Sequence, residues 1–139
     1  MKGITLIDHA ADVGMDVCAD SLSELFSRAA AGMTSLMFAD EPINRTASAC
    51  VTHEIEVEAS DASALLVAWL RELLYLHAMQ DFAYVSATFN ALTETRLQAR
   101  ATGVTHPDAG GREIKGVTYH GLDVANRDGT WRARVIFDV

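Results

Sequence analysis

The chain has 139 residues, of which 50% are hydrophobic and 22% are charged, and this composition excludes disordered, collagen-like and coiled-coil proteins. Nineteen acidic residues outnumber eleven basic ones, for a formal net charge of -8. An acidic surface repels phosphate backbones, so direct binding to DNA or RNA is not expected. The sequence therefore predicts a single domain over residues 1–139 that suits a cation or a protein partner.

Membrane insertion and secretion are not indicated. The longest apolar run, residues 64–70, is far too short to cross a bilayer. The N-terminal segment has one lysine and no long apolar stretch before Asp8, which is not typical of a secretory signal. The two cysteines, Cys18 and Cys50, lack the spacing of a zinc or redox motif. We expect a reducing, cytoplasmic setting and no membrane crossing.

The N-terminal half predicts two strands followed by a helix. Residues 4–7 are apolar, and from residue 12 apolar and polar residues alternate as in a half-buried strand. Ser21 and Glu24 form a capping box, because each side chain can accept a hydrogen bond from a free amide of the first turn. Apolar residues then recur at helical spacing, which predicts a helix over residues 21–38.

A third strand and a second helix follow. Residues 50–59 alternate between apolar and polar side chains, which predicts a strand. Ser60 and Asp61 can cap a helix over residues 62–79. That helix would be roughly 27 Å long, enough to cross several strands of a sheet. We expect both helices to cover a sheet.

The remaining segments predict strands over residues 83–90, 95–103, 113–125 and 130–138. Asp128 and Gly129 lie between the last two and indicate a tight hairpin, because type I′ turns require positive φ at both central residues. Two strands, a helix, a strand, a helix and then antiparallel strands indicate an α+β fold. We expect the two helices to pack on one side of a mostly antiparallel sheet.

Acidic and imidazole groups gather where the predicted strands end. Asp8, His9, Asp12 and Asp138 lie at strand ends or in adjoining loops, and oxygen-rich clusters suit hard divalent cations. If the last strand lies beside the strand that begins at Asp12, then Asp12, Asp138 and a main-chain or terminal oxygen of Val139 could converge on one ion. Aspartates at strand ends also act as turn formers, and the pattern alone leaves both readings open.

A second group of candidates lies around residues 115–120. Lys115 and His120 could contact a phosphate or a carboxylate, although a solvated lysine and a hydrogen-bonded histidine fit the same pattern equally well. The sequence has neither GxSxG nor GxxxxGK[ST], which disfavours a hydrolase nucleophile elbow and a P-loop.

Three segments resemble the archease family in order, spacing and coverage. They are DHAADVGMDVCADSLSELFSRAAAGMTSLM, ALLVAWLRELLYL and EIKGVTYHGLDVANRDGTWRARVIFDV, which together span nearly the whole chain. The resemblance implies an α+β protein of the cytoplasm that is not itself a ligase. It implies an activator of the GTP-dependent tRNA-splicing RNA ligase RtcB, which promotes guanylylation of the ligase histidine and hence multiple turnover.

The resemblance also implies a set of site residues. It assigns a divalent cation, calcium first and magnesium or manganese as alternatives, to Asp12, Asp138 and main-chain oxygen of Val139. It places Lys115 among the functionally important residues. In our reading, His120 is a further contact for the partner or a phosphate, and Asp8 and His9 orient the site from behind. One departure is Ala10, where many archeases have threonine, so a hydrogen bond behind the site is lost.

Two other classes of function remain open at this point. A metal-dependent phosphoesterase would also use clustered carboxylates, but it needs a concave pocket and a general base, for which His9 is the nearby candidate. A general chaperone or adaptor would use the acidic surface, and its activity would not depend on Asp12.

Overall fold

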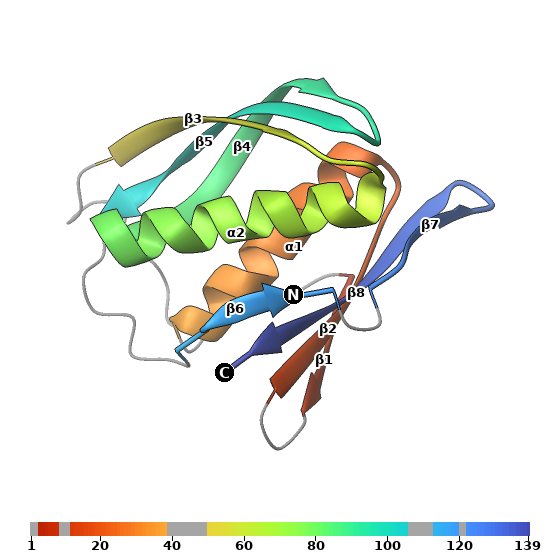
Figure 1. Cartoon of the computed structure of the whole chain (residues 1–139), viewed down its shortest axis with the longest axis horizontal. Coiled ribbons are helices and arrows are strands. Elements are labelled where there is room, and N and C mark those ends of the chain that lie inside the picture. The colour runs from red at the N-terminus through yellow and green to blue at the C-terminus, as the bar shows by residue number, and fades with distance from the viewer. Residues whose placement is uncertain (1–2, 9–11, 39–49, 106–112, 120–121) are drawn as a thin grey trace.

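Two helices lie between two antiparallel sheets in the computed structural model of the chain (Figure 1). The structure describes residues 3–8, 12–38, 50–105, 113–119 and 122–139. One sheet has five strands, in the order β1-β2-β8-β6 with β7 also paired to β8, and the other has three, in the order β3-β5-β4. The bounds are β1 Ile4–Asp8, β2 Asp12–Ala19, α1 Leu22–Met37, β3 Cys50–Glu58, α2 Ala62–Gln80, β4 Phe82–Leu92, β5 Arg96–Thr105, β6 Gly116–Thr118, β7 Val124–Arg127 and β8 Thr130–Asp138.

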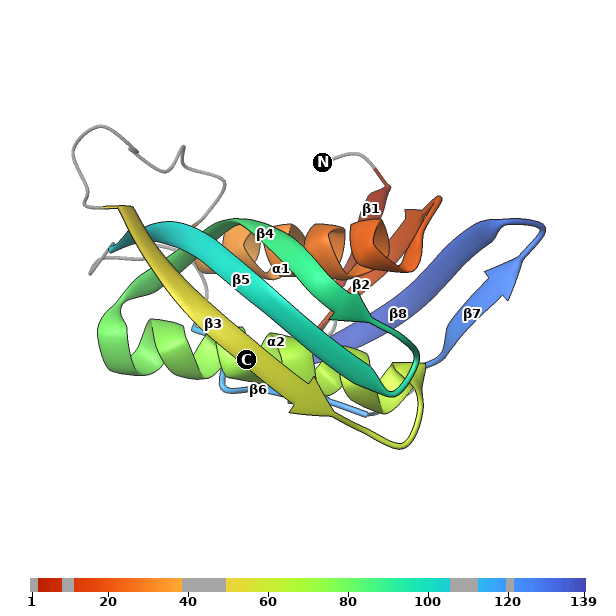
Figure 2. The same cartoon turned by 90° about the horizontal axis from the view of Figure 1, so that it is seen from above.

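The α+β class and the antiparallel pairing agree with the sequence, but the strands divide between two sheets. Helix α1 contacts β2 and β4, and α2 contacts β3, β4 and β6, so each helix touches both sheets. Viewed from above, β3, β5 and β4 cover the pair of helices, and the five-stranded sheet lies beneath them (Figure 2). The pair of helices is therefore packed between two sheets, whereas the sequence pattern predicted that the helices cover one side of a single sheet.

Both helices begin at the predicted capping residues. The Ser21 hydroxyl accepts a hydrogen bond from the Glu24 amide at 3.2 Å, and an Asp61 carboxylate oxygen accepts one from the Ala64 amide at 2.8 Å. These bonds satisfy amides that have no partner within the helix. The Glu24 carboxylate pairs with Arg28 one turn later, as expected for opposite charges four residues apart.

Helix α2 is long and apolar because it is a core helix. Of the helices that the structure describes, it alone has the length and mean hydropathy that a membrane span would require. Its apolar residues pack between the sheets: Leu65, Leu66, Val67, Trp69, Leu70 and Leu73 are almost fully buried. Core helices of globular proteins commonly have this composition.

The prediction of one continuous strand over residues 113–125 is wrong. This segment contains two short strands, β6 and β7, which pair with different parts of β8, residues 136–138 and residues 130–133. Between them the Leu122 amide donates to the Tyr119 carbonyl at 3.1 Å. The Val124 amide then donates to the Ser63 hydroxyl at 3.0 Å, which ties the start of β7 to α2.

The hairpin between β7 and β8 has the predicted turn. Asp128 and Gly129 have φ values of 54° and 83°, as both central residues of a type I′ turn require. The alternation that follows places Ala133, Val135 and Phe137 of β8 in the core. The intervening side chains of β8 therefore face the side of the sheet away from the helices.

One buried tyrosine links α1 to the three-stranded sheet. Tyr84 is 4% exposed, and its hydroxyl lies 2.8 Å from the Ser27 hydroxyl. Burial raises the pKa of Tyr84 above its usual value of 10.0, and the hydrogen bond with Ser27 opposes this in part. The folded state therefore holds the Tyr84 proton at pH values where the unfolded chain begins to lose it.

We expect the stability of the protein to fall above about pH 10, with Tyr84 contributing up to about 1.4 kcal/mol per pH unit. The pKa of Tyr84 is higher in the folded state than in the unfolded chain. Its contribution to the free energy of unfolding is therefore complete below the unfolded-state pKa and is lost as the pH rises towards the folded-state pKa. Tyr84→Phe should remove this component and cost about 1 kcal/mol at neutral pH through the lost hydrogen bond. Urea unfolding from pH 8 to 11 measures both effects.

The control is Tyr75→Phe, on an exposed side chain, which should retain the wild-type pH dependence. If the free energy of unfolding fell equally with pH in wild type and in Tyr84→Phe, the assignment to Tyr84 would be contradicted.

Candidate functional site

The predicted juxtaposition of Asp12 and Asp138 is present. Strands β2 and β8 are antiparallel neighbours, and Asp12 lies directly opposite Asp138 at the end of the ladder. Opposed residues in an antiparallel pair project from the same face, with Cβ atoms about 5 Å apart. The two carboxylates therefore share the face of the five-stranded sheet that points away from the helices.

This pair is electrostatically unfavourable by itself. Two like charges directly opposite each other destabilise an antiparallel pair. Asp12 is half-buried, and its Oδ1 atom is buried without a hydrogen-bond partner among the described residues. A buried carboxylate oxygen without a donor is rare in folded proteins because its lost hydration is not replaced. A cation between the carboxylates would replace that hydration, so the residues present fit a hard divalent ion.

Strand β6 completes the surroundings of Asp138. Gly116 lies opposite Asp138 on the other side of β8, and the Lys115 amide donates a hydrogen bond to the Asp138 carbonyl at 2.7 Å. A Cβ atom at Gly116 would meet no described residue within 4 Å. The described residues therefore leave space beside Gly116, and the side chain of the neighbouring Lys115 is exposed.

Val139 can contribute only main-chain oxygen to this site. Its side chain is partly buried and packs against the hydrophobic core, in keeping with the alternation along β8 that sends Asp138 to the other face. No group of three or more His, Cys, Asp or Glu side chains that could hold a metal occurs in the described part of the chain. Two carboxylates alone leave most positions around a calcium ion to main-chain oxygens and water.

The other predicted site residues are placed only in part. Asp8 ends β1 and lies opposite Val13, the neighbour of Asp12, so its backbone is close to the pair. His9, Ala10 and His120 fall outside the described ranges. The predicted roles of His9 and His120, and the effect of alanine at position 10, stay predictions.

Sequence reasoning missed Arg71, which holds β6 against the molecule. Its Nε and Nη2 atoms donate to the Val117 carbonyl at 3.1 and 2.9 Å, and its guanidinium lies 4.9 Å from the centre of the Tyr119 ring. Val117 is the residue after Gly116, so Arg71 fixes the strand that borders Asp138. Arg71 is exposed on α2, and no local pattern marks its role, because the carbonyl that it binds lies 46 residues further along the chain.

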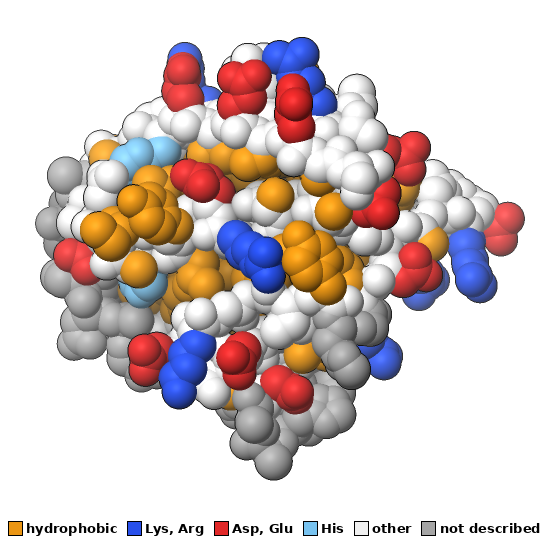
Figure 3. All heavy atoms as spheres, in the orientation of Figure 1, with side chains coloured by type: hydrophobic (Ala, Val, Ile, Leu, Met, Phe, Trp, Pro, Cys, Tyr) orange, Lys and Arg blue, Asp and Glu red, His pale blue; other side chains and the backbone are white. Residues whose placement is uncertain are grey.

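The flank of α2 beside β6 is exposed and partly apolar. Tyr75 and Met79 follow Arg71 at intervals of four residues, and with Tyr119 they are the large hydrophobic side chains that lie exposed in the described structure. Residues four apart share one face of a helix. In the same orientation as Figure 1, hydrophobic atoms gather across the middle of this face of the molecule, around a basic side chain (Figure 3).

Comparison with known proteins identifies relatives over almost the full length. The Archease protein family matches residues 5–139. "Protein archease" of Thermococcus kodakarensis is 31% identical over 142 residues, covering 95% of each chain. "Protein archease" of Methanothermobacter thermautotrophicus is 29% identical over 146 residues and covers 100% of both chains.

Two solved structures have the same fold. The solution structure of Methanobacterium thermoautotrophicum protein 1598 has a TM-score of 0.76 at 27% identity and covers 100% of both chains. The crystal structure of an archease from Thermotoga maritima, described as a possible chaperone, has a TM-score of 0.66 at 18% identity and covers 96% of this chain and 94% of that one. With the family match over residues 5–139, these comparisons show that the chain belongs to the archease family.

Proposed function

We propose that this protein activates an RtcB-type, GTP-dependent RNA ligase by presenting a divalent cation at the Asp12–Asp138 pair. The observation that carries the proposal is the cross-strand register of the two aspartates, with a buried Asp12 oxygen that has no partner among the described residues. The archease family supports the class of function. The partner, the cation and the cytoplasmic setting are part of the proposal.

The donors proposed for the cation are Asp12, Asp138 and main-chain oxygen of Val139. Carboxylate and carbonyl oxygens suit calcium best, and magnesium or manganese would use the same donor types. A bound cation supplies positive charge that can neutralise triphosphate oxygens as pyrophosphate leaves. Asp12 is half-buried at the ladder end, and Asp138 is exposed, so the pair can meet a partner while one oxygen stays shielded from water.

Lys115 is the proposed contact to the partner or to a phosphate. Its amide is fixed on the Asp138 carbonyl, and its side chain is exposed, which leaves the ammonium group free to reach a neighbouring surface. His120 is proposed as a second contact, and Asp8 and His9 as groups that orient Asp12. Arg71 is proposed to act indirectly, because its hydrogen bonds hold β6 in place and thereby position the segment that starts at Lys115.

An activator fits this geometry better than a phosphoesterase. Hydrolytic sites enclose their substrate in a pocket with a positioned general base. One cavity of ≈ 710 Å³ that the described residues form is lined by neither Asp12 nor Asp138. The aspartate pair instead lies at the end of the β2–β8 ladder, where the exposed Asp138 can meet a partner protein.

The setting proposed for this activity is the cytoplasm. Cys18 and Cys50 are both free thiols, as a reducing compartment maintains them. The formal net charge of -8 favours recognition of the ligase protein over direct binding of the tRNA.

The test is a time course of guanylylation of the purified ligase with GTP and a divalent cation. Wild type is expected to accelerate formation of the guanylylated ligase, whereas Asp12→Ala and Asp138→Ala should lose at least tenfold in rate. Glu94→Gln, an exposed acid in the hairpin between β4 and β5, is the matched control and should behave as wild type.

Circular dichroism and thermal unfolding establish that each variant is folded. Full activation by both folded alanine variants would remove the aspartate pair from the function. Suppression of aggregation of unrelated proteins, equal in wild type and Asp12→Ala and without any effect on the ligase, would instead favour the chaperone class.

A further inference from the structure

A cavity occupies the open face of the five-stranded sheet, away from the helices. Its volume is ≈ 710 Å³, and its walls come from β1, β2, β7 and β8. This volume is in the range of sites for small molecules, about 300–1,000 Å³. Two of its lining residues, Asp16 and Arg134, are four residues from Asp12 along β2 and four residues from Asp138 along β8, respectively. The cavity is therefore about 13 Å from the aspartate pair along the strands.

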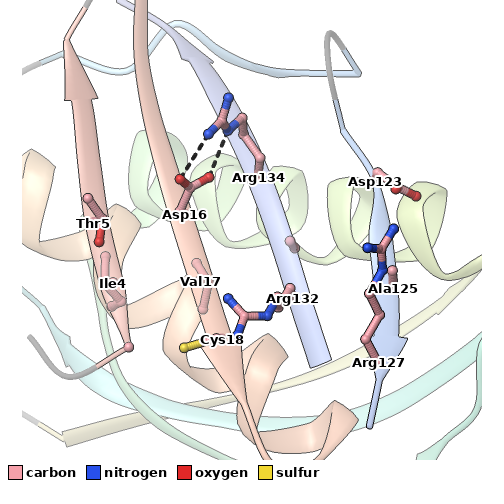
Figure 4. A pocket seen from close by; sticks show the side chains of 12 residues that line it. Ile4, Thr5, Asp16, Val17, Cys18, Asp123, Ala125, Arg127, Arg132 and Arg134 are labelled. Atoms are coloured by element: carbon pink, nitrogen blue, oxygen red, sulfur yellow. Dashed lines mark hydrogen bonds and ion pairs between the residues drawn. The ribbon is translucent and has the colours of Figure 1, made fainter. Parts of the chain in front are cut away.

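Three arginines line this cavity, in a chain whose formal net charge is -8. Arg134 donates two hydrogen bonds to Asp16, at 2.7 and 3.0 Å, and these bonds hold the pKa of that carboxyl below its usual value. Figure 4 shows Arg134 reaching across to Asp16, Arg132 directed from β8 towards Cys18, and Arg127 lying along β7 in the direction of Asp123. Within the described structure, Arg127 and Arg132 have no ion-pair or hydrogen-bond partner.

The local sequence explains why these arginines face the cavity. Arg132 and Arg134 alternate with Ala133 and Val135, which are buried against the helices, so the two arginines must project from the opposite face. Arg127 follows the same alternation on β7 and ends that strand just before the turn at residues 128–129. Because a two-residue hairpin fixes strand register, the backbones of Arg127 and Arg132 are held side by side, and both side chains line the cavity.

We propose that this cavity binds a small phosphorylated molecule, whose phosphate lies between Arg127 and Arg132. Guanidinium groups bind phosphate oxygens through paired, charge-assisted hydrogen bonds. Arg134 is already neutralised by Asp16 and serves as a wall of the site, which leaves two arginines to meet the ligand. Asp123 and the Thr5 hydroxyl also line the cavity and offer hydrogen-bond partners to hydroxyl groups of a sugar or similar moiety.

The charge distribution favours a small anion over a long one. A nucleic acid strand would extend beyond the cavity over a surface with an excess of acidic residues, where its phosphates would be repelled. A small phosphorylated molecule places its charge only where the arginines lie. An acidic peptide from a partner would extend over the same acidic surface as a nucleic acid strand, whereas a compact ligand places its charge within the cavity. The inference does not depend on the proposed function.

Isothermal titration of the full chain with inorganic pyrophosphate and with ATP, both in excess chelator, tests the proposal. The chelator removes any contribution of a cation at the aspartate pair. Wild type should bind both probes, and adenosine should bind at least tenfold more weakly than ATP. Arg127→Gln and Arg132→Gln should each weaken pyrophosphate binding at least tenfold, and raised salt should weaken it in wild type.

A control variant makes the result specific. Arg100→Gln changes an exposed, ion-paired arginine on the three-stranded sheet and should bind as wild type. Absence of pyrophosphate and ATP binding to wild type at millimolar concentration would overturn the proposal. An equal loss of pyrophosphate affinity in Arg100→Gln and Arg132→Gln would also overturn it. The same holds if a 20-nucleotide single-stranded RNA or a polyglutamate peptide binds to the wild type more tightly than ATP does.

Discussion

Addition of calcium to the metal-free protein is expected to raise its midpoint of thermal unfolding, by on the order of 5–10 °C at a free ion concentration 100 times the dissociation constant. A ligand that binds only the folded state stabilises it by about 2.7 kcal/mol at that concentration. The folded state brings Asp12 and Asp138 together as a cross-strand pair, whereas an unfolded chain holds them far apart. The measurement is calorimetry with and without chelator.

Asp12→Asn should separate the two effects of the aspartate pair. It removes one of two opposed negative charges, so the metal-free variant should be as stable as the metal-free wild type or up to about 1 kcal/mol more stable. It should also lose the shift with calcium, because one of two carboxylate donors is gone. If the aspartate pair binds a cation, the unfolding midpoint of Asp12→Asn should be equal to or higher than that of wild type without calcium, and it should not change when calcium is added.

The matched control for this experiment is Glu94→Gln, which makes the same change of charge at an exposed position in the hairpin between β4 and β5. It should retain the calcium shift of wild type. An unchanged unfolding midpoint of wild type at millimolar calcium, magnesium and manganese would remove the cation from the proposed function. Equal shifts in wild type and Asp12→Asn would place the ion elsewhere.

Trp69→Ala is expected to destabilise the fold by about 3–5 kcal/mol, a large part of the total stability of a domain of this size. Trp69 is 0% exposed on α2, and its indole nitrogen donates to the Phe26 carbonyl of α1 at 3.0 Å. Its ring also meets Tyr84 and Phe89 of the three-stranded sheet, at centroid distances of 6.1 and 5.4 Å. One side chain thus joins both helices to one sheet.

Trp69→Phe keeps most of the apolar volume but removes the donor, so it should cost less than the alanine variant, about 1–3 kcal/mol. Trp131→Ala is the matched control, because Trp131 is only partly buried on β8, and it should cost less than Trp69→Ala. Chemical denaturation with an unchanged m-value measures all three. A loss below 1 kcal/mol in Trp69→Ala would show that the layers are joined elsewhere.

The candidate site was only partly accessible from the sequence. Asp12 and Asp138 could be named as oxygen donors from their residue types and strand ends. Their pairing could be stated only as a condition, that the last strand lies beside the second. The role of Arg71 could not be predicted, because its partner in β6 is distant in the chain. Arg127 and Arg132 share a face across the two-residue hairpin, but the cavity that they line also needs β1 and β2, which the sequence does not place beside them.

The sequence by itself determined the local elements: the caps at Ser21 and Asp61, the type I′ turn at residues 128–129, and the alternation that buries one face of each strand. These features depend on side chains within a few residues of one another. Only the tertiary structure decided that the strands form two sheets around the helices, that residues 113–125 split between two parts of β8, and that Asp12 faces Asp138. Strand partners are chosen by the packing of the whole core, because many pairings satisfy the same alternation.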